Sequence, residues 1–311
     1  MITAKEFDLT GITCSALDEG QRIDVYLSGE TGRSRSFVQK ITSDGLVKVN
    51  GKVVKPGFKL SEGDEIEFEM PECEPLEITA ENIPLDIVYE DDDLIVVNKP
   101  KGMVVHPAAG NFSGTLVNAL MYHCGDSLSG INGVLRPGIV HRIDKDTTGL
   151  LVACKNDRAH TAIAEQLAVH SITRVYHAIV YNPFDTEEGT VDAPIARHPV
   201  ERKKMAIAKR GGKRAVTHFH LVENLGRYAY ITLKLETGRT HQIRVHMASI
   251  HHPLLGDTVY GPKNDPFKLT GQALHAGTLG FVHPSTGEYM EFHADPPAYF
   301  SELLEKLRKT T

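Results

Sequence analysis

Polar side chains that could do chemistry gather in residues 137–151, PGIVHRIDKDTTGLL, between apolar neighbours. A short β segment there delivers His141, Arg142 and Asp144 into a loop, and strand ends are places where a rigid scaffold holds reactive groups still. A carboxylate in apolar surroundings takes up a proton unless a cation compensates its charge. Asp144 therefore needs a cationic partner, and Arg142 and Arg244 are the candidates.

A second polar stretch, residues 237–257, reads TGRTHQIRVHMASIHHPLLGD and follows a predicted strand that ends near Glu236. We expect Thr240 to cap a helix over residues 241–249. Apolar side chains form one stripe on that helix, and Arg244 lies at the edge of the stripe. From there a guanidinium can reach a buried carboxylate through a short bidentate contact.

These groups also have an ordinary structural interpretation. Asp144 or Asp146 could cap a turn or form an ion pair that only stabilises the fold. A third polar stretch, KPKGMVVHP at residues 99–107, is typical of a loop fixed by prolines and Gly102. The chain has no Ser-His-Asp signal, no G-x-x-x-x-G-K-[ST] phosphate loop and no G-x-G-x-x-G after a strand, which excludes the commonest hydrolases, nucleotide-dependent transferases and dehydrogenases.

Three neighbouring histidines raise the alternative of a metal-dependent nuclease. His246, His251 and His252 form an H-x4-H-H pattern before Pro253, without H-E-x-x-H and without a further ligand at suitable spacing. We interpret them as residues of a helix end and its following loop, and expect no metal. The four cysteines show no C-x-x-C spacing, which argues against a zinc ribbon or a disulfide framework.

The distribution of charge favours a polyanionic partner, although the formal net charge is −6. Residues 22–59 hold eight Lys or Arg against three acids, and residues 197–214 hold eight against one. Residues 62–93, which lie between the two, hold 14 acids and no Lys or Arg. Either basic segment alone could be a solvated face, but together they favour a protein that grips the phosphates of RNA or DNA.

The N-terminal part predicts a small α/β module. One helix is expected to begin within residues 21–27, and a second, capped by Ser34, to span residues 35–42. A hairpin is expected around the pair Asn50-Gly51, because this pair favours a two-residue turn. We place the module at residues 1–75, with a core at about 20–70, and a linker at 76–86.

The remainder, residues 87–311, predicts an α+β domain with a mixed, largely antiparallel sheet, because its short apolar segments alternate with helices without a regular βαβ rhythm. No apolar run approaches the roughly 20 residues of a membrane span, and the N-terminus lacks the layout of a signal peptide. We therefore expect a cytoplasmic protein. Strands are predicted at 87–89, 94–97, 139–140, 150–153, 175–180 and 228–235, and a further helix near 159–169.

Four segments resemble the motifs of the RluA-type pseudouridine synthases. HRIDKDTTGLL resembles the family signature, roughly H-R-L-D-x-x-T-S-G-L-L, and KPKGMVVHP resembles the first motif. RVYHAIV resembles the tyrosine motif, and TGRTHQIRVHMASIHHPLLGDTVYG resembles the third motif. They occur in the family's order over residues 99–261. The departures, Ile143 for Leu, Thr148 for Ser and His251 for Gly, remove no charged group.

The resemblance implies a pseudouridine synthase fold and a role for each matching residue. The catalytic residues would be Asp144, Arg244 and Tyr176, and the substrate-binding residues His141, Arg142 and Ile243. In the family the aspartate is essential, one arginine pairs with it and another fills the gap left by the flipped uridine. The tyrosine and an apolar residue lie beside the target base. No cofactor is implied.

The N-terminal module resembles the "S-four" RNA-binding fold, named after a ribosomal small-subunit protein, and points to the RluD-like branch, which modifies large-subunit ribosomal RNA. The implied activity is isomerisation of specific uridines to pseudouridine, in free ribosomal RNA or in an assembling large subunit, by a monomer. A non-catalytic ribosome-assembly factor is the alternative. The predicted phosphate contacts are Arg33, Arg35, Lys40, Lys48, Arg202, Lys203 and Lys204.

Overall fold

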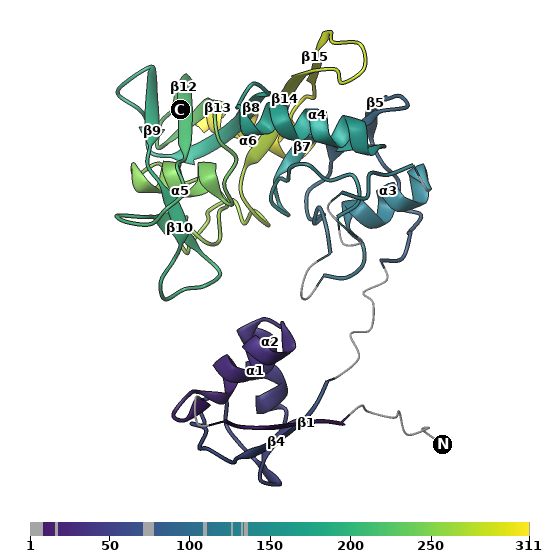
Figure 1. Cartoon of the computed structure of the whole chain (residues 1–311). Coiled ribbons are helices and arrows are strands. Elements are labelled where there is room, and N and C mark those ends of the chain that lie inside the picture. Colours follow the sequence, from purple (N-terminus) through teal and green to yellow (C-terminus); the bar gives the residue numbers. More distant parts are fainter. Residues whose placement is uncertain are drawn as a thin grey trace. The chain divides into compact units, whose positions relative to one another are not determined.

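The chain divides into two units, Met1–Leu76 and Glu77–Thr311, in the computed structural model (Figure 1). The structure describes residues 9–15, 18–70, 78–107, 111–125, 127–131, 133 and 136–310. Among these residues, no helix combines the length and apolar character that a membrane span needs. The two units are described in turn.

The first unit is a four-stranded antiparallel sheet with two helices. Its elements are β1 (Leu9–Thr13), α1 (Ile23–Thr31), α2 (Arg35–Ser43), β2 (Val47–Val49), β3 (Lys52–Val53) and β4 (Glu65–Glu69), with the strand order β1-β4-β2-β3. The predicted cap is confirmed, since Ser34 Oγ accepts a hydrogen bond from Phe37 N at 3.3 Å. The predicted hairpin is also confirmed, and Asn50 and Gly51 both have positive φ, 49° and 74°. Helix α1, which the sequence predicts to begin within residues 21–27, ends where Gly32 turns left-handed.

A buried carboxylate joins the two helices of this unit. Asp24 is fully buried and accepts hydrogen bonds from Arg22 Nε at 2.9 Å, Arg35 Nε at 3.0 Å and the Gln39 amide at 2.5 Å. The Arg22 hydrogen bond, more than any other contact, holds the pKa of Asp24 well below its ordinary value. Arg35 therefore has a structural partner in addition to the RNA contact predicted for it.

The second unit is built on a nine-stranded sheet, and the predicted largely antiparallel α+β architecture is confirmed. Only β7 and β14 run parallel among the described strand pairs of this sheet. The strand order is β5-β6-β7-β14-β8-β13-β12-β9, with β15 paired to β14. The strands are β5 (Ile87–Glu90), β6 (Leu94–Lys99), β7 (Thr148–Cys154), β8 (Thr173–Tyr181), β9 (Glu188–Asp192), β12 (Val216–Leu225), β13 (Tyr228–Leu235), β14 (Leu274–Val282) and β15 (Tyr289–His293).

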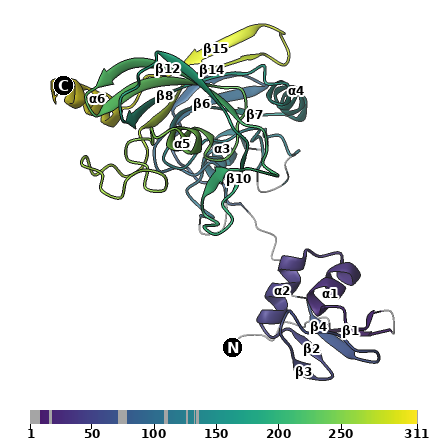
Figure 2. The ribbon, with the colours of Figure 1, turned by 90° about the vertical axis from the view of Figure 1, so that its left-hand side faces the viewer.

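Helices cover both faces of this sheet (Figure 2). Alternate residues of a strand point to opposite faces, so in β6 Ile95 and Val97 join one core cluster while Leu94 and Val96 join another. Helices α3 (Leu116–Cys124) and α5 (Gln242–Ser249) pack on the first face. Helices α4 (Asp157–Ala168) and α6 (Ala298–Thr310) pack on the second. Every residue of β7 is buried, as expected of a central strand covered on both sides.

A close backbone approach fixes the parallel pair β7–β14. Gly149 has φ +108°, and a Cβ there would lie 2.2 Å from the carbonyl oxygen of Ala276. Only glycine fits this position without strain. The pairing brings the loop that precedes β7 next to the segment that precedes β14, although the two are more than a hundred residues apart in sequence.

Residues 78–86 pack on the second unit, so the structure differs here from the predicted linker. Ile78 is buried in the core on the α3 side, and the carbonyl of Thr79 accepts a hydrogen bond from the Asn118 side chain at 2.8 Å. Asp86 accepts from the side-chain amide of Asn98 at 2.9 Å. Acidic and proline-rich composition suggests a linker, but these contacts assign the segment to the second unit.

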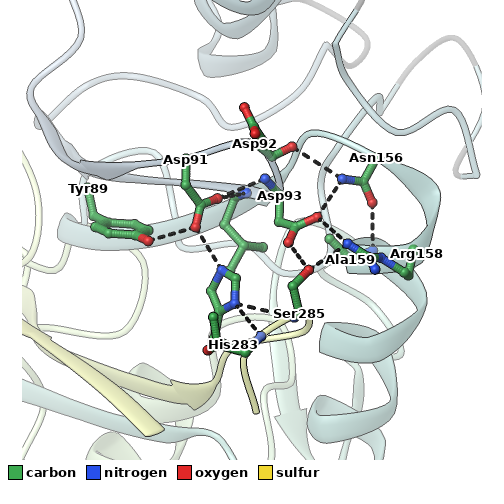
Figure 3. A network of polar contacts seen from close by, with 11 residues as sticks. Tyr89, Asp91, Asp92, Asp93, Asn156, Arg158, Ala159, His283 and Ser285 are labelled. Atoms are coloured by element: carbon green, nitrogen blue, oxygen red, sulfur yellow. Dashed lines mark hydrogen bonds and ion pairs between the residues drawn. The ribbon is translucent and has the colours of Figure 1, made fainter. Parts of the chain in front are cut away.

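A polar network ties one corner of the sheet together (Figure 3). In the turn between β5 and β6, Asp91 binds His283 Nε2 at 2.7 Å. Asp93 accepts from Asn156 at 2.8 Å and Arg158 at 3.2 Å, and also from Ser285. The network joins this turn to the start of α4 and to the β14–β15 connection, so its role is structural.

Candidate functional site

An arginine held between two carboxylates forms the centre of the site. Asp144 lies four residues before β7, and its Oδ2 accepts from Arg244 Nη1 of α5 at 2.9 Å. Arg244 also makes a bidentate contact with Asp257, Nε to Oδ2 at 2.7 Å and Nη2 to Oδ1 at 2.9 Å. The Asp257 side chain is fully buried, whereas that of Asp144 is 17% exposed. The structure thus brings together the acid and the cation that the sequence pairs.

Asp257 is a residue of the site that the sequence analysis missed. Burial alone would raise its pKa, but hydrogen bonding and charge from Arg244 lower it below the ordinary value. The backbone N–H groups of Val259 and Tyr260 donate to its Oδ1 at 2.9 and 3.0 Å. Burial likewise opposes the charge of Arg244, yet the two carboxylates raise its pKa. Asp257 thereby fixes the guanidinium and leaves Nη1 directed at Asp144.

The KPKG stretch supports the loop that carries Asp144. The Lys99 ammonium is buried and donates to the carbonyl oxygens of Pro100 at 2.8 Å, Met103 at 2.8 Å and Lys145 at 3.0 Å. Burial lowers the pKa of Lys99 to about 7. The first motif therefore acts on the site through the backbone next to Asp144.

A pocket of about 410 Å³ opens beside the ion pair. Asp144 and Arg244 line it, together with the buried ring of Tyr176 from β8 and the buried side chain of Ile243 from the first turn of α5. Burial raises the pKa of the Tyr176 phenol. A flat ring, an aliphatic side chain and a carboxylate therefore bound one pocket, which is large enough to admit a planar heterocycle.

The start of α5 differs from the prediction. The N-cap is His241 in the left-handed region, φ 55°, and not Thr240. The segment that leads into the helix is held by the Gln242 side chain, whose Oε1 accepts from Thr237 Oγ1 at 2.8 Å and Arg239 N at 3.0 Å. This places His241 Nε2 3.9 Å from Asp144 Oδ1, an approach that the sequence did not indicate.

The two remaining substrate-binding predictions both line the pocket. The side chain of Arg142 is exposed, as a residue that reaches toward a bound polymer must be. His141 Nε2 accepts a hydrogen bond from Val152 N at 3.1 Å, and burial lowers its pKa to about 3. His141 is therefore neutral, with one ring nitrogen committed to the fold.

The predicted phosphate contacts are spread over both units. Arg33, Lys40 and Lys48 are exposed on the first unit, and the side chain of Arg35 is half exposed despite its ion pair. On the second unit, Arg202 and Lys203 are exposed in the loop between β10 (Ile195–Arg197) and β11 (Met205–Ile207). Lys204 pairs with Glu201 at 2.7 Å.

Two of the three histidines considered as metal ligands make other contacts. His246 is buried, with Nδ1 2.9 Å from Thr217 Oγ1 and Nε2 3.0 Å from the carbonyl oxygen of Ala193. Nδ1 of His252 lies 3.1 Å from the carbonyl oxygen of Asn182. Within the described part of the chain, no three His, Cys, Asp or Glu side chains gather as a metal site would require.

Comparison with known proteins finds two matching family models and several similar proteins. Residues 93–249 match the family model described as RNA pseudouridylate synthase, and residues 21–66 match the S4 domain model. An uncharacterized RNA pseudouridine synthase, YlyB of Bacillus subtilis (strain 168), is 54% identical over 299 residues, 96% of this chain and 98% of that protein.

Two further relatives extend the comparison. The ribosomal large subunit pseudouridine synthase D of Zymomonas mobilis is 50% identical over 299 residues, 93% of this chain and 94% of that protein. Among solved structures, human RNA pseudouridylate synthase domain containing 1 superimposes with a TM-score of 0.57 at 24% identity. The match covers 76% of this chain and 98% of that one, and shows a shared fold.

Proposed function

The chain belongs to the RNA pseudouridylate synthase family, and from this premise we propose that it converts specific uridines of large-subunit ribosomal RNA to pseudouridine, with Asp144 as the essential carboxylate. The observation that carries the proposal is the Asp144–Arg244 ion pair at 2.9 Å in a pocket bounded by Tyr176 and Ile243. Uracil must leave its sugar, turn and rejoin through carbon 5 without release, which requires a pocket that retains the detached base.

Access to the target base comes first. A uridine inside folded RNA is stacked, and extruding it costs a few kcal/mol. The exposed guanidinium of Arg142, next to the pocket, can occupy the vacancy and contact phosphates. Stacking of the extruded base on the Tyr176 ring contributes roughly 1–3 kcal/mol, which offsets much of the cost.

The chemical step needs a charged carboxylate. Asp144 either attacks C1′ of the ribose or removes the proton from C2′, and both routes begin from the ionised form. Arg244 favours that form against the desolvation that a bound base imposes. Asp257 keeps Arg244 in place for this task. The phenol of Tyr176 is a candidate base for the carbon-5 proton. The isomerisation has no net redox change and no transferred group.

Three observations support ribosomal RNA as the substrate. The S4 domain match marks an RNA-binding module, and exposed basic side chains occur on both units. A relative named for the ribosomal large subunit is 50% identical over nearly the whole chain. Phosphate contacts from the first unit add affinity without reading sequence.

The test is release of tritium from large-subunit ribosomal RNA labelled at carbon 5 of uracil. We expect Asp144→Asn to abolish release while RNA binding survives. Asp146→Asn is the matched control, because it makes the same substitution in the same loop at a side chain that does not line the pocket. Full activity in Asp144→Asn would overturn the proposal.

A further inference from the structure

Arg174 is a buried arginine of the pocket wall that pairs with no carboxylate among the described residues. Arg174 is 6% exposed, the same fraction as Arg244. Arg244 contacts two carboxylates, but Arg174 Nη2 donates only to the carbonyl oxygen of Glu236 at 3.0 Å, and its Nε has no hydrogen-bond partner in the described part of the chain. A buried cation without a counter-anion is costly, so an anion from a ligand would stabilise it.

Arg174 lines the same pocket as the ring on which the base would stack. Arg174 and Tyr176 lie two residues apart on β8, so both side chains point to the face that carries the pocket, and both line it. A side chain at Gly238 would come within 2.6 Å of Arg174 Nη1, so glycine leaves room for the guanidinium there. Burial raises the pKa of Tyr176, and the charge of Arg174 acts against that rise. The field of Arg174 therefore reaches the ring against which the base would stack.

The proposed reaction creates an anion at this place. When the C1′–N1 bond breaks, its electron pair stays on N1, and the uracil carries a negative charge shared with its carbonyl oxygens. Asp144 loses its charge in the same step, by forming an ester at C1′ or by taking the C2′ proton. The negative charge of the pocket thus moves from Asp144, which Arg244 faces, to the base.

We propose that Arg174 is a catalytic residue that binds the carbonyl oxygens of the detached uracil and stabilises its negative charge, an inference that rests on the proposed function. The C5–C1′ bond then forms as the ester C–O pair returns to Asp144, or as C2′ of the unsaturated sugar recovers its proton from Asp144. The proton on carbon 5 leaves to a base, and N1 takes up a proton, which completes the isomerisation.

A phosphate is the other anion that RNA offers, and the burial of Arg174 argues for the base instead. Phosphates stay at the surface of a bound RNA, where the exposed side chain of Arg142 can meet them. A preorganised donor has its largest effect on a developing charge when it lies in a water-excluded site.

The leaving group supplies the test. Fluorine at carbon 5 stabilises the uracil anion, so an enzyme without Arg174 should lose less with 5-fluorouridine than with uridine at the target position. We would measure the single-turnover rate at which the target nucleoside disappears, by nucleoside analysis, with the full chain and both RNAs. Removing one donor to a developing oxyanion lowers rates by roughly 10²–10³-fold. We expect Arg174→Met to show a loss of this size with uridine and a loss at least about tenfold smaller with 5-fluorouridine.

Equal losses with both RNAs would overturn the inference, because a role in folding or positioning affects both alike. Arg174→Met would also overturn the inference if it kept the wild-type rate at saturating RNA but bound RNA more weakly, with the slope of log affinity against log salt concentration reduced by about one. That is the behaviour of a phosphate contact. Arg158→Met is the control, since it makes the same substitution at an exposed arginine of the corner network.

Two further variants cover a folding defect. Arg174→Lys should retain part of the rate, and added guanidinium should raise the rate of Arg174→Ala several-fold with uridine. If Arg174→Met does not fold, absence of rescue in a folded Arg174→Ala contradicts the inference. Wild-type protein that leaves uridine unchanged would instead contradict the proposed function itself.

Discussion

Replacing Asp257 by asparagine tests how the site holds the proposed catalytic pair, Asp144 and Arg244. The asparagine oxygen can take the place of Oδ1 and accept from Arg244 Nη2, Val259 N and Tyr260 N. The amide group then stands where Oδ2 accepts from Arg244 Nε at 2.7 Å, so that two donors face each other. One charge-assisted hydrogen bond is lost, about 1.5–3 kcal/mol, and a buried charge with it. We expect the free energy of unfolding to fall by about 3 kcal/mol.

The activity of Asp257→Asn should fall for a separate reason. Arg244 then has a single carboxylate partner, and its Nη1 is no longer fixed 2.9 Å from Asp144. A displacement of about 1 Å at a catalytic group can cost roughly 100-fold in rate. We expect the single-turnover rate of tritium release to fall by about that factor, while RNA affinity changes little.

Urea unfolding and single-turnover tritium release measure the two effects, at a temperature where the variant stays folded. Asp92→Asn provides the control, because its side chain is exposed and lies outside the pocket. A variant at position 257 that keeps the wild-type rate would refute the reasoning, since Asp257 would then have no part in placing Arg244.

Three further outcomes are expected. Burial depresses the pKa of His141 to about 3 and that of His106 to about 4. The stability that these neutral histidines contribute is therefore present above the ordinary pKa of 6.5 and is lost as pH falls below it. Urea unfolding should show that the free energy of unfolding falls by about 2 kcal/mol per histidine by pH 5. Gly149→Ala should lower the free energy of unfolding by about 3 kcal/mol in the same assay, because a Cβ would meet the backbone of Ala276. A protein that lacks residues 1–76 should keep a cooperative thermal transition but bind RNA with a flatter salt dependence.

Local signals in the sequence predicted local structure well. The cap at Ser34 and the turn at Asn50-Gly51 depend on residues within a few positions of each other, and both are confirmed. Strand β1 was missed because Leu9–Thr13 contains a glycine and too few apolar residues to show alternation. Strands such as β14 were also missed, since the pairing of β14 with β7 joins segments that only the folded chain brings together.

The candidate site was predicted through its motifs and not through its geometry. The residue pattern leaves Arg142 and Arg244 as candidate partners of Asp144, the resemblance to the family motifs points to Arg244, and the structure forms that pair. Asp257 lies 13 residues beyond Arg244, and nothing in that spacing shows that the chain folds back onto the guanidinium. Threonine favours the N-cap position, so the sequence predicts Thr240 there, whereas the left-handed backbone at His241 moves the cap by one residue. Arg174 gave no signal because its isolation becomes visible only when its surroundings are known.

The most direct measurement is a map of pseudouridines in total RNA from four strains. One strain lacks the gene, and the other three carry wild-type protein, Asp144→Asn or Asp146→Asn in that deletion background. Pseudouridine should be absent from defined positions of large-subunit ribosomal RNA in the deletion and in Asp144→Asn, and present with the wild type and Asp146→Asn. A map that is identical in all four strains, or that Asp144→Asn restores, would contradict the claim that this carboxylate carries out the isomerisation.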